Sequence, residues 1–279
     1  EFGVHLGLLN DHRCLGPLGD LMDTAATLGQ ALADNVGHQN AYSSAACTYL
    51  IPIGDRFAFG FGVYDRHLPG ADQIYTIFAG TAVNKVRRIT GRPDLPIEIL
   101  LSIAPPPQPG RFEQLLRAPV HFNQPLSCIM LTPDALAMRN PNADTASRPQ
   151  ALERVRRMLR RDDMSVTSRL RHQLRPSLSL GETSLVEAAR HLGLSARTLD
   201  RHLQEDGTTF QRERDEVRHV MACELLGLTE LQIGEIALAL SYANHSGFAR
   251  SFLRWSGESP SAWRARNVPP RPPVAPRVL

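Results

Sequence analysis

The chain has 279 residues, 42% of them hydrophobic and 21% charged, proportions typical of a soluble globular protein with two domains. Its longest apolar stretch, Ile97 to Ala104, is far too short to span a bilayer, which excludes a transmembrane helix and leads us to expect a cytoplasmic protein. The net charge of +3 is unevenly distributed, because residues 1–150 carry 11 Lys and Arg against 13 Asp and Glu, whereas residues 151–279 carry 20 against 15. Arginine, the dominant basic residue, makes bidentate contacts to phosphate and to guanine edges.

The chain opens Glu1-Phe2-Gly3 without an initiator Met and without a basic and apolar leader, so we expect no secretory signal and a start trimmed from the native one. The four cysteines are far apart and form no C-x-x-C pair: Cys14, Cys47, Cys128 and Cys223. This spacing suits neither a zinc site nor a small disulfide scaffold. We expect no metal and no cofactor.

Residues 1–138 show a mixed pattern that predicts an α+β domain. A helix is expected over Leu18 to Asn35 and another over Gln73 to Ile89. Between them, Phe57 to Val63 alternates large apolar side chains with Ala and Gly, the period-2 pattern of a strand. A second apolar stretch, Ile97 to Ile103, predicts another strand, which the three prolines that follow would end.

Residues 139–150 are polar, contain prolines and lack apolar periodicity, which is typical of a linker. The pattern then becomes helical throughout, beginning with a helix over Ala151 to Arg161 in a connecting segment, 151–179. An all-α domain is expected over 180–266. The tail, 267–279, is rich in Pro and Arg and is expected to be disordered.

Three helix starts in the C-terminal third are marked by capping residues. We expect two capping boxes and one serine cap followed by proline: Ser184 with Glu187, Thr229 with Gln232, and Ser259 before Pro260.

The segment Leu185 to Leu203 has the pattern of a helix-turn-helix unit. Small Ala189 allows close packing, Gly193 permits a positive-φ turn, and Ser195 caps a second helix. If this second helix enters the major groove, Arg197 and Arg201 avoid its apolar face and meet base edges.

About 49 residues later the pattern recurs in Ile233 to Phe252. Apolar residues at helical spacing are expected to face inward, and they are Ile236, Ala237, Leu240, Phe248, Phe252 and Trp255. His245, Ser246 and Arg250 are left facing outward. The helix expected between the two units has an apolar stripe that includes Phe210 and Leu225. Packing on this stripe would hold the two recognition helices about 34 Å apart on one face of DNA.

Residues 180–266 resemble the DNA-binding domain of the AraC/XylS family of bacterial transcription regulators. The most specific match is the stretch from Phe248 to Arg264, FARSFLRWSGESPSAWR, with its terminal G-x-S-P-x-x-x-R. The resemblance implies a sequence-specific, DNA-binding transcription regulator, commonly an activator, whose partners are promoter DNA and RNA polymerase. The DNA-contacting positions carried over or inferred from spacing are Ser195, Arg197, Thr198, Arg201, Asn244, His245, Ser246 and Arg250.

One residue departs from the family pattern, because Ser241 stands where the family usually has Gly. Serine tolerates positive φ less well, so we expect imperfect docking of the second unit. His191, His202 and His219 lack metal spacing and are interpreted as surface or hydrogen-bonded residues.

Residues 2 to about 138 resemble, more faintly, the arabinose-binding type of N-terminal effector domain found in one branch of the family. The matching stretches are Phe2 to Gly7, Gly16 to Gly19, Thr27 to Leu32 and Arg117 to Phe122. The resemblance implies ligand sensing by a small-molecule effector or homodimerisation. It transfers no effector-binding residue.

Two alternatives remain open. One is a co-regulator that acts through protein contacts and has lost DNA reading in its second unit. The other is a DNA-repair enzyme that uses an AraC-like module, a chemistry that needs activated cysteines. No G-x-S-x-G or H-E-x-x-H motif is present, and Gly60-Phe61-Gly62 is interpreted as strand and not as a phosphate loop, so we expect no enzyme.

Overall fold

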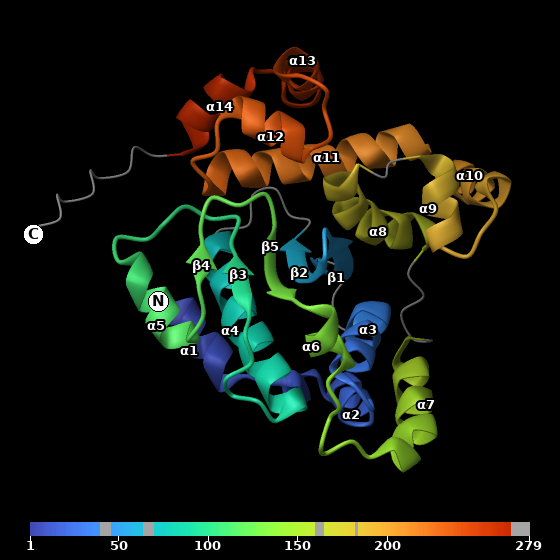
Figure 1. Ribbon diagram of the computed structural model, residues 1–279. Coiled ribbons are helices and arrows are strands. Elements are labelled where there is room, and N and C mark those ends of the chain that lie inside the picture. Colours follow the sequence, from blue (N-terminus) through green and yellow to red (C-terminus); the bar gives the residue numbers. More distant parts are fainter. Residues whose placement is uncertain (40–45, 64–69, 160–164, 182–183, 269–279) are drawn as a thin grey trace, which may run out of the picture.

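A computed structural model describes residues 1–39, 46–63, 70–159, 165–181 and 184–268 (Figure 1). Its first part combines one sheet with helices, and its second part is all helical, which confirms the expected fold class. None of the helices in these ranges is both long enough and apolar enough to cross a membrane.

In its described residues, the first part contains short helices, one long helix and five strands. Its helices are α1 (Phe2–Leu9), η1 (His12–Leu15), α2 (Pro17–Asp23), α3 (Leu28–His38), α4 (Ala71–Thr90), α5 (Pro109–Leu116), α6 (Pro133–Ala137), η3 (Thr145–Ser147) and α7 (Arg148–Leu159). Its strands are β1 (Ala46–Ile53), β2 (Arg56–Val63), β3 (Glu98–Leu100), β4 (Val120–His121) and β5 (Ser127–Leu131).

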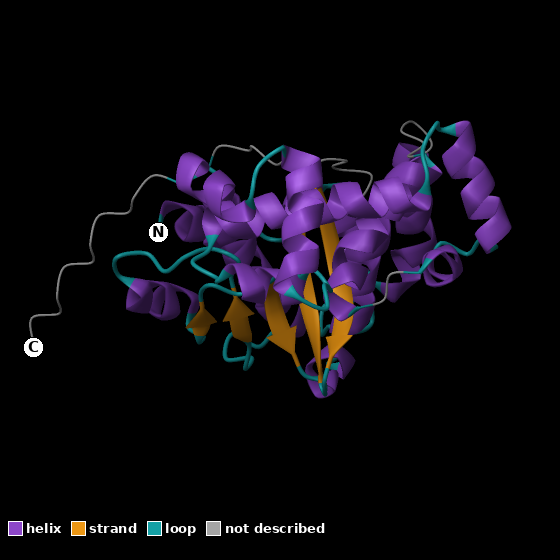
Figure 2. Cartoon of the chain, turned by 90° about the horizontal axis from the view of Figure 1, so that it is seen from above, coloured by secondary structure: helices purple, strands orange, loops and turns teal. Residues whose placement is uncertain are grey.

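The strands form one sheet in the order β1-β2-β5-β3-β4, and they lie side by side in Figure 2. All neighbours are antiparallel except β3 and β4, which are parallel. In the β1–β2 hairpin Ala46 pairs with Val63 and Tyr49 pairs with Gly60. The predicted strand over Phe57 to Val63 is confirmed as β2.

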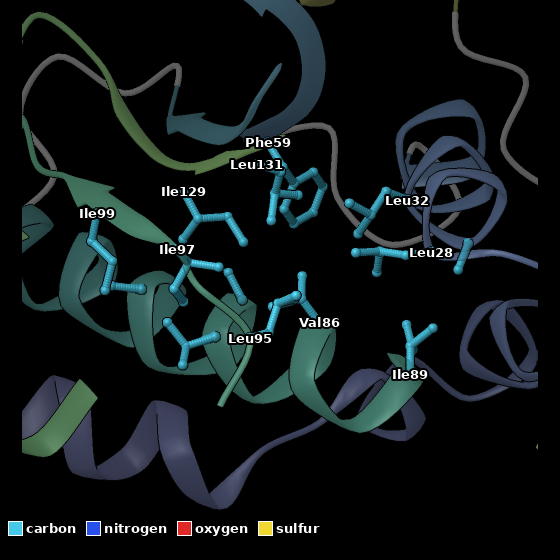
Figure 3. Packing of buried hydrophobic residues seen from close by; sticks show 14 of the residues in the cluster. Leu28, Leu32, Phe59, Val86, Ile89, Leu95, Ile97, Ile99, Ile129 and Leu131 are labelled. Atoms are coloured by element: carbon cyan, nitrogen blue, oxygen red, sulfur yellow. The ribbon is translucent and has the colours of Figure 1, made fainter. Parts of the chain in front are cut away.

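One face of the sheet packs against α3 and α4. Phe59, Ile129 and Leu131 point from the strands toward Val86 of α4 and Leu32 of α3, and all five are fully buried (Figure 3). The helix predicted over Gln73 to Ile89 is therefore confirmed as the central helix of this core. Burial of such side chains contributes roughly 1.5–3 kcal/mol each.

On the opposite face of the sheet, the residues contributed by β2 are small, next to larger ones such as Tyr49 and Met130. Because side chains alternate along a strand, Ala58, Gly60 and Gly62 of β2 share this face. A Cβ on Gly60 would lie 2.2 Å from the Tyr49 ring, and one on Gly62 would lie 1.8 Å from Nε of Arg175 in the second part. The absence of a side chain at Gly60 therefore makes room for Tyr49 of β1, and its absence at Gly62 makes room for Arg175 of α8.

The second part is a helical array around its own apolar core. Its helices are α8 (Val166–Leu180), α9 (Leu185–His191), α10 (Ala196–Glu205), α11 (Phe210–Leu228), α12 (Ile233–Ala239), α13 (His245–Ser256) and α14 (Pro260–Asn267). Leu170, Leu174 and Leu178 of α8 are buried in this core. The helix that precedes the first helix-turn-helix unit therefore packs with both units.

Two elements of the first part differ from the sequence expectation. The helix expected over Leu18 to Asn35 is two helices, because Thr24 ends α2 by donating its hydroxyl to Leu21 O and Thr27 starts α3 as its N-cap. The strand expected over Ile97 to Ile103 is only β3. Beyond Leu100 the regular strand pairing ends, although the N–H of Leu101 still donates to His121 O of β4. The N–H of Ala104 donates to a carbonyl of the second part.

Two details of the second part also differ. Thr229 does not form a capping box with Gln232, because its hydroxyl donates to Leu225 O and ends α11. Gln232 itself caps α12, in a box with Glu235. The other two starts are confirmed, with Ser184 and Ser259 as N-caps.

Residues 139–159 lie against the first part. Arg148, the first residue of α7, donates a bidentate pair of hydrogen bonds to Asp34, at 2.8 and 2.9 Å. Ala151 and Val155 are fully buried in the core beneath α2.

The helix expected from Ala151 begins three residues earlier, and its predicted end at Arg161 lies outside the described residues. Asn267 still belongs to α14, and positions 269–279 of the predicted tail lie outside the described residues as well.

Candidate nucleic-acid interface

The first helix-turn-helix unit consists of α9 and α10. Ser184 and Glu187 cap α9 reciprocally, which satisfies two backbone N–H groups at its start. Ala188 and Ala189 are buried, so the second helix approaches closely. Leu199 and Leu203 of α10 are fully buried against them. This packing leaves the opposite side of α10 free to face a ligand.

The N-terminus of α10 is set by Ser195, whose hydroxyl accepts from Thr198 N at 3.1 Å. The two hydroxyl groups also hydrogen-bond each other at 2.8 Å. Arg197 is exposed one residue into the helix, and Arg201 is exposed one turn further on. Arg201 lies 3.6 Å from Glu205, and since both side chains are more than half exposed this pair contributes little. Its guanidinium is thus available to another partner.

The second unit consists of α12 and α13. Ile236, Ala237 and Leu240 are fully buried, and Phe248 and Phe252 of α13 are fully buried opposite them. These predicted inward-facing positions are therefore confirmed, and Trp255, the remaining one, is partly buried against the same core.

The N-cap of α13 is Asn244, whose side-chain oxygen accepts from Gly247 N at 2.8 Å. His245 and Ser246 are exposed in its first turn, and Arg250 is exposed one turn later. Arg250 is the sixth residue after its N-cap, as Arg201 is in the first unit. The two recognition helices therefore place an arginine at the same position.

The turns of the two units have the same backbone geometry. Gly193 has φ 70° and Ser241 has φ 60°. In each turn the next residue donates its N–H to a carbonyl of the preceding helix at 2.9 Å, from Leu194 to Ala189 and from Tyr242 to Ala237. Serine therefore adopts at the second turn the positive-φ conformation that glycine has in the first turn. The imperfect docking of the second unit on DNA stays a prediction.

Helix α11 lies between the two units: α10 precedes its N-terminal end, and α13 packs across its N-terminal half and middle, where Asp215 pairs with Arg254 and His219 stacks on Trp255 (Figure 1). With 19 residues it spans roughly 28 Å at 1.5 Å per residue. Successive major-groove segments on one face of DNA are about 34 Å apart. Arg218 of α11 lies over the Tyr242 ring, 4.8 Å from its centroid, and links this spacer to the second turn.

Three of the four cysteines are buried, and two of the four have thiols with a raised pKa. Cys47, Cys128 and Cys223 are buried, and burial raises the pKa of Cys128 to about 12. Cys14 is exposed, but partial burial of its thiol raises its pKa as well. Within the described residues no group of three or more His, Cys, Asp or Glu side chains could hold a metal ion.

Sequence reasoning missed the polar contacts that join the two parts. Arg175 of α8 and Glu224 of α11 form an ion pair, with side chains 5% and 7% exposed. The one available signal was Glu224, the single charge in the apolar run from Val220 to Leu228. Arg175 carried no comparable signal.

Comparison with known proteins covers both parts. Residues 1–140 match the arabinose-binding domain of AraC transcription regulators, and residues 188–266 match a helix-turn-helix domain. The chain belongs to the AraC family. Its fold class and paired helix-turn-helix units are those of a DNA-binding transcription regulator of this family, as the resemblance implied.

Named AraC-family relatives are transcription regulators of bacteria. The ornithine utilization regulator of Pseudomonas aeruginosa is 30% identical over 180 residues, 63% of this chain, and the match spans about half, 52%, of that protein. The regulator VirS of Mycobacterium tuberculosis is 24% identical over 269 residues, 95% of this chain and 78% of that protein. Among solved structures, the transcriptional regulator CdpR of Pseudomonas aeruginosa matches 94% of this chain and 86% of that chain, with 23% identity and a TM-score of 0.47.

Proposed function

We propose that this AraC-family chain binds promoter DNA sequence-specifically in the cytoplasm of a bacterium and recruits RNA polymerase there as an activator. The supporting observation is the pair of capped, exposed recognition helices with Arg201 and Arg250 at equivalent positions. In this proposal Arg197, Arg201 and Arg250 read guanine edges. Ser195 and Asn244 cap their helices and add contacts to DNA. Thr198 adds a contact from the first turn of α10, as His245 and Ser246 do from the first turn of α13.

We further propose that residues 1–138 form the effector domain and that a small metabolite binds there. The match to the arabinose-binding domain supports this assignment. A relative that is named for ornithine utilization makes amino acids the first class of effector to test. Homodimerisation through this domain belongs to the same proposal, as do the boundaries 139–150 for the linker and 180–266 for the DNA-binding domain.

The co-regulator alternative rested on Ser241, and the turn around that residue now has the geometry of its glycine counterpart. The DNA-repair alternative needs a reactive thiol, and the raised pKa values of Cys14 and Cys128 favour the protonated forms. We therefore propose a regulator without catalytic activity.

In vitro selection from random duplexes with the full chain tests this proposal. We expect enrichment of a motif with two boxes and an affinity that falls steeply as the salt concentration rises, because Arg contacts release counterions from the phosphates. Retention of DNA without any enriched motif would contradict sequence-specific binding. A shift in melting temperature with ornithine or another amino acid, and none with a matched sugar, would assign the effector class.

A further inference from the structure

Helix α8 contacts the turns of both helix-turn-helix units. At the first turn, Arg169 donates to Leu192 O at 3.4 Å. At the second turn, the Ser241 hydroxyl donates to Leu178 O. Nine residues of one helix therefore separate the contacts to the two units. Any rotation or shift of α8 changes the position of both turns together.

Arg175 lies between these two contacts and fastens α8 to the sheet of the first part. Its Nη1 donates to Val63 O at 2.9 Å, and its Nη2 donates to Tyr75 Oη at 3.3 Å. The same Nη2 pairs with the carboxylate of Glu224 on α11. One buried guanidinium thus joins α8, α11 and two elements of the first part.

Glu224 is fastened to the sheet independently. Its second carboxylate oxygen accepts from the Ser102 hydroxyl at 3.3 Å, and Ser102 in turn hydrogen-bonds the Ser127 hydroxyl of β5 at 2.7 Å. Both serines are fully buried. Helix α11, which spaces the two units, is therefore held at this point by contacts from two sides.

The end of α11 is held as well, just before the second unit begins. Ala104 N donates to Leu228 O at 2.6 Å, and the side-chain oxygen of Asn123 accepts from Glu230 N at 2.8 Å. These contacts lie within five residues of Ile233, the first residue of α12. They fix where the second unit starts relative to the sheet.

A buried ion pair is a poor source of stability, because removing both charges from water costs about as much as their attraction returns. Apolar residues of similar volume would hold the two parts together at least as well. An arginine with three directional partners instead specifies one orientation. The absence of a side chain on Gly62 lets Arg175 lie directly against the strand.

The contact of α8 and α11 with the first part leaves the proposed base-contacting side chains accessible, because Arg197, Arg201 and Arg250 are all exposed. The contact with the first part therefore orients the recognition helices and does not cover them. We propose that Arg175 is a positioning residue for DNA recognition. Together with Glu224 it holds α8 and α11 against the sheet in one orientation, and this orientation sets the spacing between DNA boxes that the two units accept. The inference rests on the proposed function.

The test uses the full chain and the two-box duplex obtained by selection, together with duplexes in which one or two base pairs are inserted between the boxes. The double variant Arg175→Met, Glu224→Met replaces both charges by apolar side chains and leaves neither partner buried alone. We expect insertion to weaken binding of the unchanged chain by about tenfold or more, as a lost base contact does. The double variant is expected to bind all spacings within about threefold of one another, and to bind a single-box duplex as the unchanged chain does.

Arg148→Gln is the matched control. It removes another partly buried arginine with a bidentate carboxylate partner, Asp34, but at a site within the first part. Its spacing dependence should equal that of the unchanged chain. If the double variant does not fold, as judged by circular dichroism, two single variants replace it: Tyr75→Phe removes the hydroxyl that accepts from Arg175, and Ser102→Ala removes the hydroxyl that donates to Glu224. Each should relax the spacing dependence partly.

The inference is overturned if a folded double variant, or both the Tyr75→Phe and the Ser102→Ala variants, retain the full spacing dependence. It is also overturned if the unchanged chain selects a two-box motif but tolerates inserted base pairs. A chain that selects no motif at all contradicts the proposed function instead, so the two failures are distinguishable.

Discussion

Gly193 and Ser241 occupy the same place in two successive turns, with φ of 70° and 60°, although only one of them is a glycine. The positive φ of Ser241 is accompanied by a contact that glycine cannot make, the hydrogen bond from its hydroxyl to Leu178 O. The left-handed conformation costs a non-glycine residue about 1–2 kcal/mol, and a net hydrogen bond contributes about 1 kcal/mol. These two effects are similar in size, which explains how serine is accommodated.

Substitutions at Ser241 should separate the two effects. Ser241→Ala keeps the backbone strain and loses the hydrogen bond, so we expect the free energy of unfolding to fall by about 1 kcal/mol. Ser241→Gly loses the same bond but relieves the strain, so it should change stability by less than about 0.5 kcal/mol or raise it. Urea denaturation measures both. Because both variants lack the hydroxyl, an alanine variant as stable as the glycine variant would contradict the backbone strain assigned to position 241.

Glycine-to-alanine changes at Gly62 and Gly37 should have opposite effects. A Cβ at Gly62 would lie 1.8 Å from Nε of Arg175, whereas one at Gly37 in α3 would meet nothing within 4 Å. We expect Gly62→Ala to lower the free energy of unfolding by about 1–3 kcal/mol through overpacking. Gly37→Ala should raise it by up to about 1 kcal/mol, because alanine favours helix.

Chemical denaturation of both glycine variants provides the measurement, and limited proteolysis between the two parts provides a second readout. Gly62→Ala should also speed cleavage there, because the displaced Arg175 no longer holds α8. Equal stability of the two variants would mean that Arg175 does not lie against this strand.

Lys85 should make stability depend on pH in the alkaline range. Its amino group is buried, donates to Asn35 Oδ1 at 2.5 Å and lies 5.3 Å from the centroid of the Phe59 ring. Burial lowers the pKa of Lys85 to about 8, below its value in the unfolded chain. Between these two pKa values the unfolded chain binds more protons, so the contribution of this group to stability rises with pH from about 8 to about 10.

Comparison with Lys85→Met isolates this effect from the titration of tyrosine and cysteine. The free energy of unfolding of the unchanged chain, minus that of the variant, should increase by roughly 2–3 kcal/mol between pH 8 and pH 10 and should stay level below pH 7. Guanidinium denaturation across this range measures the difference. A difference that is independent of pH would show that Lys85 titrates normally.

The sequence predicted those features of the fold that depend on local pattern. The alternation from Phe57 to Val63 indicated a strand, and the spacing from Ile233 to Phe252 indicated two packed helices. Local signals failed where two of them compete, as at Thr229, whose hydroxyl can cap the next helix or end the previous one. Tertiary packing decides between these roles.

In the candidate interface, too, local pattern predicts some residues, and tertiary packing decides the others. Arg201 and Arg250 could be assigned from their distance to a predicted cap, since a helix fixes which residues share a face. The roles of Arg175 and Gly62 could not be assigned in this way, because their partners lie about 110 residues apart in sequence and meet only when α8 docks on the sheet. No periodicity within either segment encodes that contact.

The central claim is that two recognition helices each read their own box of DNA, and footprinting of single-arginine variants tests it most directly. The unchanged chain should protect two segments centred about 10 base pairs apart. Arg201→Ala should weaken protection of one segment and Arg250→Ala that of the other, each by about 1–3 kcal/mol of binding free energy. Arg254→Ala, which removes an exposed arginine of α13 paired with Asp215, should leave both segments protected. Uniform loss of protection in both variants, or unchanged protection in either, would contradict the account.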